Sequence, residues 1–227
     1  MLSNSEFLPS KKEFFEFLKI RFVTVGIDFN DIEQYLLASL EISEKRFRLN
    51  KSKYFTSQEG DRARFSATHY SSHALLLYQL SRECFLQGRI DLAEKIYFLN
   101  ISTTATDLFY EIELPIKTGC DHPLGSVIGR AEFRLDSSLF FCQSCNIGNN
   151  IDSSGKPIYP EVSGNLFMYP RSTIIGQCIV RGDVILASGT YVKDYGVLEN
   201  VVVFGASPRL TLKPITDFQS YQRSVFD

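Results

Sequence analysis

The sequence contains few histidines and cysteines, which are the usual ligands of structural zinc. It has three histidines and five cysteines in 227 residues. Cys142 and Cys145 have the spacing of half a zinc site, but no second such pair follows, and structural zinc usually needs four ligands. We therefore predict no metal site. An odd number of cysteines in a chain without an export signal also favours reduced thiols over a disulfide framework.

Long apolar runs and an excess of one charge are both absent. Charged side chains interrupt residues 1–22, so this segment predicts neither a signal peptide nor a membrane span, and we expect a cytoplasmic protein. The formal net charge is −2, and basic and acidic residues are interspersed along the chain. No broad basic surface is expected, which argues against nucleic acid as a partner. With 44% hydrophobic residues the chain should be globular.

The first half of the chain repeats its apolar residues at helical spacing. Polar residues 50–61 predict a loop, and glycines punctuate the apolar segments. Four helices are predicted, one containing Phe14 and ending at Gly26, one capped by Asp28 or Asn30, one over about residues 63–86, and one starting at Asp91. Residues 1–104 are therefore expected to form a small helical domain.

The second half has a different period. From residue 162 onward an apolar residue stands at every sixth position, at Val162, Met168, Ile174, Val180, Leu186 and Val192. A small or apolar residue follows four positions after each of the first five, at Leu166, Ser172, Cys178, Val184 and Thr190. A sustained period of six fits neither a helix nor an antiparallel hairpin. It predicts a solenoid in which each six residues form one flat side, with the first residue inward and a turn around the third and fourth.

Short motifs stand at regular intervals ahead of these repeats. His73-Ala74-Leu75 comes first, Asp107 follows it, and Asp121-His122 comes next, with His122 fifteen positions after Asp107. The supporting segments are Gln87-Gly88-Arg89, Val127-Ile128-Gly129 and a closing run from Gly205 to Lys213. Together these motifs, which match in spacing without a gap from His73 to His122, resemble the serine acetyltransferases over about residues 60–214.

The resemblance implies an α+β fold, with an N-terminal helical domain followed by a C-terminal left-handed parallel β-helix of hexapeptide repeats. The domains expected from it are residues 1–104, residues 105–213 and a C-terminal tail over residues 214–227. We expect the tail to lie across a neighbouring subunit or to be loosely ordered.

The same resemblance implies an O-acetyltransferase with acetyl-CoA as donor. His122 would remove the proton of the acceptor hydroxyl, and Asp107 would orient the imidazole. Because their separation is almost one coil of three hexapeptides, these two side chains can meet on adjacent layers. Asp121 matches a family residue that contacts the acceptor.

Acetyl-CoA in this family lies in a cleft between neighbouring subunits, which implies a homotrimer or a hexamer made of two trimers. The positions of this chain that match cofactor contacts are Gly148, Asn149, Pro170, Ser188, Arg209 and Lys213.

Structural interpretations of the same residues stay open. His122 can be a histidine at a coil corner, and Asp107 can cap a turn. His73 lies among leucine residues, so we interpret it as packing or a contact between helices. Arg209 and Lys213 can be solvated charges near the end of the coil.

The motif that helps to hold the acceptor in this family has changed here. The family has an Arg-His pair before a proline, and Ile158-Tyr159 stands here before Pro160. Isoleucine cannot grip a carboxylate, although Lys156 can partly substitute. Three hypotheses follow: serine O-acetylation with Lys156 and Tyr159 in an altered pocket, O-acetylation of a sugar hydroxyl in a capsule or lipopolysaccharide with Tyr159 under the ring, and a non-catalytic β-helix scaffold.

Overall fold

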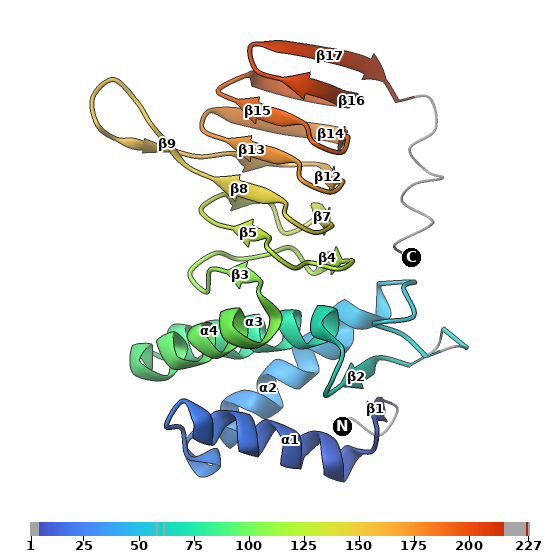
Figure 1. The fold of residues 1–227 in the computed structure, drawn as a ribbon, viewed down its shortest axis with the longest axis vertical. Coiled ribbons are helices and arrows are strands. Elements are labelled where there is room, and N and C mark those ends of the chain that lie inside the picture. Colours follow the sequence, from blue (N-terminus) through green and yellow to red (C-terminus); the bar gives the residue numbers. More distant parts are fainter. Residues whose placement is uncertain (1–4, 58, 61, 216–225, 227) are drawn as a thin grey trace. The chain divides into compact units, whose positions relative to one another are not determined.

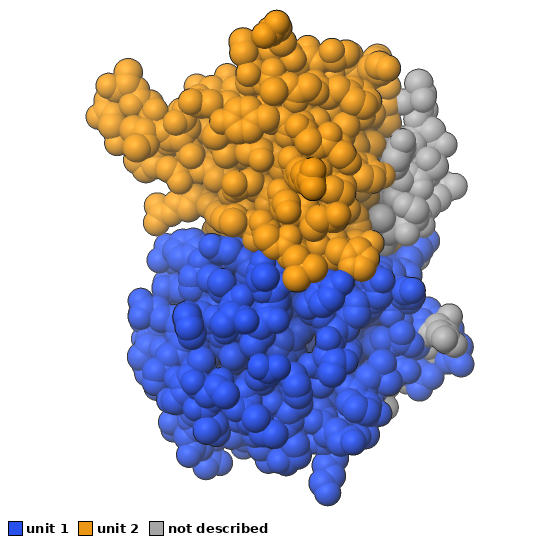
Figure 2. Space-filling view, in the orientation of Figure 1, with its two compact units in different colours: residues 1–111, 227 blue, residues 112–226 orange. Residues whose placement is uncertain are grey.

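The computed structural model describes residues 5–57, 59–60, 62–215 and 226. The chain forms two compact units, residues 1–111 and residues 112–226, which we call the helical unit and the coil unit (Figure 2). Within the described residues, no helix combines the length and apolar character needed to cross a bilayer.

The helical unit contains the four predicted helices and a short strand pair (Figure 1). Its main elements are α1 (Lys11–Thr24), α2 (Phe29–Arg48), α3 (Tyr70–Leu86), α4 (Ile90–Thr104), β1 (Glu6–Leu8) and β2 (Arg64–Ser66). The side chain of Ser10 caps α1 by accepting a hydrogen bond from the Glu13 N–H, and Asp28 caps α2 in the same way from the Asn30 N–H.

The predicted start of the third helix near residue 63 is wrong. Residues 64–66 form β2, which pairs in parallel with β1, and the helix begins only at Tyr70. The Ser66 hydroxyl accepts hydrogen bonds from the Thr68 and His69 N–H groups, and His69 Nδ1 then caps α3 by accepting from the Ser71 N–H. These local acceptors offer the backbone an alternative to helix before Tyr70.

The core of the helical unit contains a cluster of aromatic rings. Phe65 of β2 stacks on Phe7 of β1, with ring centroids 5.2 Å apart, and packs against Phe47 of α2 at 5.1 Å. Helix α3 is buried continuously over residues 71–81, which makes it the central helix of this unit.

The coil unit is a left-handed parallel β-helix of short strands stacked in three columns (Figure 1). One column contains β4 (Lys117–Cys120), β7 (Ser138–Phe141), β12 (Asn165–Met168) and the second half of β14 (Cys178–Leu186). The next contains β5 (Val127–Ile128), β8 (Asn146–Gly148), β13 (Thr173–Ile175) and β15 (Tyr191–Lys193). The third contains β6 (Glu132–Phe133), β11 (Glu161–Val162), the first half of β14 and β16 (Gly196–Ala206).

The predicted period of six is confirmed. The six apolar residues that stand at every sixth position between Val162 and Val192 are all buried. The five residues that stand four positions after them are buried as well. The turns fall at the third or fourth position of each repeat, where Arg171, Gly176, Gly182, Gly189 and Asp194 have positive φ. Space at these corners is tight, because a Cβ on Gly164 would overlap the backbone of Gly182 one coil later.

One coil is longer than the next. Asn165 pairs with Asp183, which is eighteen positions further along the chain, but Ser138 pairs with Asn165, which is twenty-seven positions further along. The additional residues form a hairpin of β9 (Asn150–Ile151) and β10 (Pro157–Ile158), which projects from the coil in Figure 1.

The last coil is closed by β17 (Arg209–Pro214), which runs antiparallel to β16. The predicted tail mostly lies outside the described residues. Of its aromatic residues only Phe226 is described, and it is buried against Phe167 and Ile185 on an outer face of the coil.

Candidate active site

His122 stands on a tight turn directly after β4. Its backbone is left-handed, with φ of +48°, a conformation that histidine adopts more readily than most residues. The Leu124 N–H donates to the His122 carbonyl at 2.8 Å, and the Ser126 N–H donates to the Pro123 carbonyl at 3.0 Å. The imidazole is about half exposed, with 49% of its side-chain surface accessible. A rigid turn therefore presents a solvent-accessible base.

Asp121 lies beside this imidazole. Its Oδ1 is 3.5 Å from His122 Nε2, and that oxygen is buried without a hydrogen-bond partner among the described residues. The Asp121 N–H donates to the Phe141 carbonyl of the next coil, which holds the carboxylate in place. An acceptor bound at Nε2 would also reach this carboxylate.

Asp107 belongs to the helical unit, where β3 (Asp107–Leu108) follows α4. Tyr97 of α4 donates a short hydrogen bond of 2.5 Å to Asp107 Oδ1. Burial, followed by this bond to a carboxylate, raises the pKa of Tyr97, so its hydroxyl remains a donor at neutral pH. The predicted pairing of Asp107 with His122 joins residues of different units and stays a prediction. Tyr97 was missed by sequence reasoning, because its short separation from Asp107 in the chain resembles ordinary helix packing.

The two predicted acceptor residues of the hairpin lie together. Lys156 and Tyr159 line a hollow of about 390 Å³, with Ile158 beside them. Three carboxylates, from Glu132, Asp152 and Glu161, line the same hollow.

The Tyr159 hydroxyl donates to Glu132 Oε1 at 3.2 Å. Asp152 accepts hydrogen bonds from the Ser154 side chain and from the Lys156 N–H. These bonds lower the pKa of Asp152, and the bond from Ser154 has the larger effect. The hollow is therefore richer in negative than in positive charge, a feature that the sequence motif alone did not predict.

This hairpin hollow and His122 occupy different corners of the coil. The His122 turn leads from the β4 column to the β5 column, whereas the hairpin is inserted between β8 and β11. His122 does not line the hollow. Within one chain Lys156 and Tyr159 thus do not share a pocket with His122, whereas Asp121 lies beside it.

Two of the predicted cofactor positions lie on the same edge as His122. A ladder of backbone hydrogen bonds joins the turns there: the Ser144 N–H donates to Leu124, the Arg171 N–H donates to Gln143, and the Gly189 N–H donates to Pro170. Pro170 and Ser188 therefore belong to turns stacked above the His122 turn. Since neighbouring strands are about 4.8 Å apart, three coil steps span about 14 Å.

The other predicted cofactor residues are elsewhere on the coil. Gly148 ends β8 and Asn149 follows it at the next corner, before the hairpin. Arg209 begins β17, and Lys213, in the same strand, lies over the Phe204 ring at 5.4 Å. Gly148 and Asn149 are thus at a different corner from Pro170 and Ser188, whereas β17 pairs with the segment of β16 that runs next to the Ser188 turn.

The cysteines and His73 are not among the candidate active-site residues. All five cysteines are free, and burial raises the pKa of Cys142 to about 12, so its thiol is protonated near neutral pH. Among the described residues, no group of three His, Cys, Asp or Glu side chains is arranged to hold a metal ion. His73 forms the predicted contact between helices, because its ring packs edge-on against Phe17 of α1 at 5.9 Å.

Comparison with solved structures gives close overall agreement with one group of enzymes. The serine acetyltransferase of Brucella abortus strain S19 superposes with a TM-score of 0.64 at 17% identity, covering 91% of this chain and 92% of that one. The chain has the fold of the serine acetyltransferases. No protein-family model matches the sequence, and no curated protein matches it significantly.

Two further structures with this serine acetyltransferase fold contain ligands. The Neisseria gonorrhoeae enzyme in complex with serine has a TM-score of 0.61 at 18% identity, over 84% of this chain and 80% of that one. The Brucella abortus enzyme in complex with coenzyme A has a TM-score of 0.56 at 17% identity, over 89% and 75%. At these identities the likeness defines the fold, and the chemistry has to be argued from the residues.

Proposed function

We propose that this protein is an acetyl-CoA-dependent O-acetyltransferase in which His122 is the general base. The observation that carries the proposal is the geometry of the His122 turn. An exposed imidazole is held by a rigid turn, with its Nε2 3.5 Å from the Asp121 carboxylate, in a fold shared with serine acetyltransferases.

The reaction is a direct acyl transfer. His122 Nε2 takes the proton from the acceptor hydroxyl as the oxygen attacks the thioester carbonyl of acetyl-CoA. The carbon–sulfur bond then breaks, and the imidazolium returns its proton to the departing thiolate. Asp107 would orient the imidazole through Nδ1 and stabilise its charged form, as the carboxylate of a serine-protease triad does.

We place acetyl-CoA along the edge on which His122 lies. The turns containing Pro170 and Ser188 continue this edge by hydrogen bonds from coil to coil, so an extended donor could run along them from the acetyl group at His122. Gly148, Asn149, Arg209 and Lys213 stay candidate contacts for its more distant parts. Arg209 and Lys213 would serve as cations for phosphate.

L-Serine is the acceptor that we place first. Asp121 lies where it would attract the ammonium group of an amino acid whose hydroxyl reaches His122. A neighbour with this fold is in complex with serine, which supports the same choice. The product would be O-acetylserine, with coenzyme A released.

A sugar hydroxyl is the second candidate, and the hairpin hollow favours it. Its three carboxylates can accept hydrogen bonds from sugar hydroxyls, and a sugar ring can stack on Tyr159. Ile158 stands where the family has an arginine, so the bidentate contact with the carboxylate of an amino acid is lost. A glycan acceptor would use the same base.

The proposed site needs more than one copy of the chain. Because His122 and the hairpin hollow lie at different corners, a neighbouring subunit would have to bring its hairpin to the His122 of the first. We propose a homotrimer as the smallest active form, and a hexamer would pair two trimers.

The test measures the release of coenzyme A from acetyl-CoA, by detecting its free thiol. L-serine is tried first as acceptor, and then a panel of sugars and oligosaccharides. Each acceptor is run with wild-type protein and with His122→Asn. His122-dependent release with serine would support the first acceptor, and release with a glycan alone would support the second. Release that persists in the variant would disprove the role of His122. If no acceptor gives release of coenzyme A, a non-catalytic scaffold would be favoured.

A further inference from the structure

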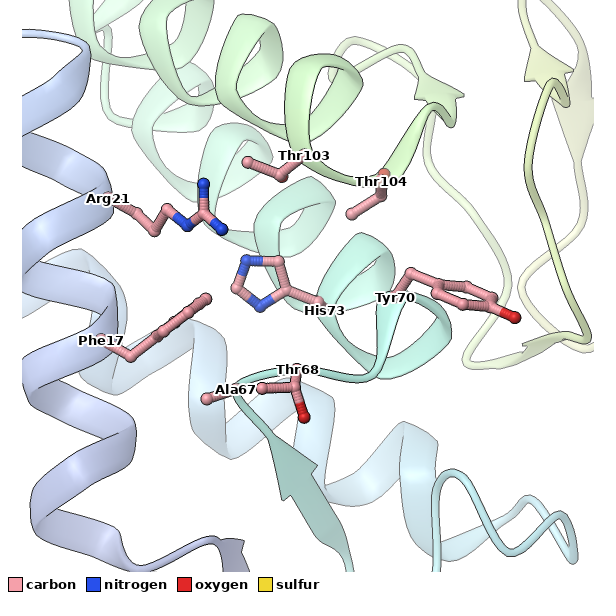
Figure 3. A pocket seen from close by; sticks show the side chains of 8 residues that line it. All are labelled: Phe17, Arg21, Ala67, Thr68, Tyr70, His73, Thr103 and Thr104. Atoms are coloured by element: carbon pink, nitrogen blue, oxygen red, sulfur yellow. The ribbon is translucent and has the colours of Figure 1, made fainter.

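A second hollow lies in the helical unit, lined by residues of three helices and of the segment that precedes α3. Its volume is about 210 Å³, and its walls include Phe17 and Arg21 of α1, His73 of α3, and Thr103 and Thr104 at the end of α4 (Figure 3). That volume is several times the space occupied by one water molecule in the liquid, about 30 Å³. It suits a small organic molecule better than a single ion.

His73 is the feature that points to a ligand. The residue is only 5% exposed, and neither of its ring nitrogens has a hydrogen-bond partner among the described residues. Figure 3 shows one nitrogen directed toward the Arg21 guanidinium, while Phe17 packs edge-on against the ring and restricts its orientation. Buried polar atoms are usually paired, so an unpaired imidazole at a hollow indicates a missing partner.

The charge of the hollow selects an anion. Arg21 lies over the Phe17 ring at 4.9 Å, and in the described part of the chain it has no carboxylate partner. Of the residues that the structure describes, no aspartate or glutamate lines the hollow. A guanidinium fork matches a carboxylate with two parallel hydrogen bonds.

Thr103 and Thr104 supply hydrogen-bond acceptors, whereas Arg21 and His73 supply donors. Thr103 donates its hydroxyl hydrogen to the Leu99 carbonyl at 2.7 Å, and Thr104 donates to the Asn100 carbonyl at 2.8 Å. With their hydrogens engaged inside α4, both oxygens remain acceptors. They would therefore bind a donor on the ligand.

We propose that this hollow is a binding site for a short carboxylic acid that carries a hydroxyl or amino group. Arg21 binds the carboxylate, His73 offers its ring N–H to the same group, and Thr103 and Thr104 accept from the hydroxyl or amino group. Phe17 covers the carbon skeleton. The site does not rest on the proposed acetyl transfer.

The test is calorimetric titration of the full chain with three matched acids of equal size class: propionate, L-lactate and L-alanine. They differ only in carrying a hydrogen, a hydroxyl or an ammonium group next to the carboxylate. We expect lactate or alanine to bind more tightly than propionate, and the better of the two identifies the ligand class. Absence of saturable binding by all three would overturn the proposal.

Arg21→Gln should weaken binding about tenfold or more, because it removes a charge-assisted pair. Lys12→Gln is the matched control, since Lys12 is an exposed cation on the same helix and should leave affinity unchanged. Thr103→Val should remove the preference over propionate without weakening propionate itself. Thermal unfolding checks that each variant is folded.

Asp121→Asn separates this hollow from the proposed acceptor site. If the acids bind in the helical unit, this variant keeps wild-type affinity. Loss of binding in Asp121→Asn together with normal binding in Arg21→Gln would overturn the proposal, because the acids would then occupy the acceptor site.

Discussion

His122 combines a reactive side chain with a left-handed backbone, and both matter when it is replaced. Alanine at φ of +48° adds backbone strain of about 1 kcal/mol, whereas asparagine tolerates this conformation. We predict that His122→Asn lowers kcat by about 10²–10⁴-fold while the melting temperature stays close to wild type. Steady-state coenzyme A release and thermal unfolding measure the two effects. Full activity in the asparagine variant would disprove general-base catalysis.

Tyr97 is a positioning residue for Asp107 in the proposed mechanism. Tyr97→Phe removes the donor of the 2.5 Å hydrogen bond and leaves the carboxylate free to rotate. We predict a fall in kcat of about tenfold, the size expected from losing a hydrogen bond to a charged group, with KM for acetyl-CoA unchanged. The pH profile of kcat should move as well, since Asp107 would no longer orient the base. An unchanged rate and profile would show that this bond only supports the fold.

His73 makes the stability of the protein dependent on pH. Burial, and then the charge of Arg21, lowers its pKa from 6.5 to about 4 in the folded chain. Between these values the unfolded chain binds a proton that the folded chain does not, so stability falls as pH falls. We predict a loss of about 2 kcal/mol between about pH 6.5 and about pH 5.

Urea unfolding at the two pH values measures this loss. His73→Gln should reduce it, and Lys12→Gln, at an exposed position of α1, serves as the control. Equal pH dependence in wild type and His73→Gln would contradict the assignment. Of the residues lining the hollow, Arg21 and Tyr70 are the other titratable groups near this ring.

The β9–β10 hairpin is an addition to an otherwise regular coil. It makes its own coil longer than the next one, and deleting residues 151–159 restores the separation of eighteen positions at which Asn165 pairs with Asp183. We predict that this deletion keeps the β-helix folded, with KM for the acceptor raised about tenfold or more. Circular dichroism and acceptor titrations test the two parts. If acceptor KM does not change, the hairpin hollow does not bind the acceptor.

Elements with a local period could be predicted from the sequence, and elements that depend on distant partners could not. The repeat from Val162 to Val192 determined which residues are buried and where the turns fall. Strand β2 was mistaken for helix because its three residues are paired by β1, 58 positions earlier. The local pattern carries no trace of that pairing.

The candidate site shows the same division. Motif spacing predicted His122, Asp107 and Asp121 as a set. It did not predict the hydrogen bond of Tyr97 to Asp107 or the carboxylates around Tyr159. The hollow around His73 needs α1, α3 and α4 together, so no single segment could predict it.

At the scale of the assembly, the separation of His122 from the hairpin gives a test of shared sites. As homotrimers, the His122→Asn chain should have a very low kcat and the hairpin-deleted chain a raised KM for the acceptor, so both should show little activity at low acceptor concentration. Co-expressed in equal amounts, they should recover activity at about one quarter of the sites, where an intact His122 meets an intact hairpin. Sedimentation should confirm that the mixed particles are trimers or hexamers. No recovery would show that each chain contains its own complete site.

The antiparallel strand β17 determines how the coil ends. A parallel coil leaves a row of unpaired backbone groups at its last turn, and another copy could add there and extend the stack. In this protein β17 occupies the part of that row formed by residues 201–206 of β16, and the strand itself carries Arg209, Lys213 and a terminal proline, Pro214. Charges and proline discourage strand addition. The same strand that finishes the fold therefore keeps neighbouring molecules from polymerising end to end into fibres.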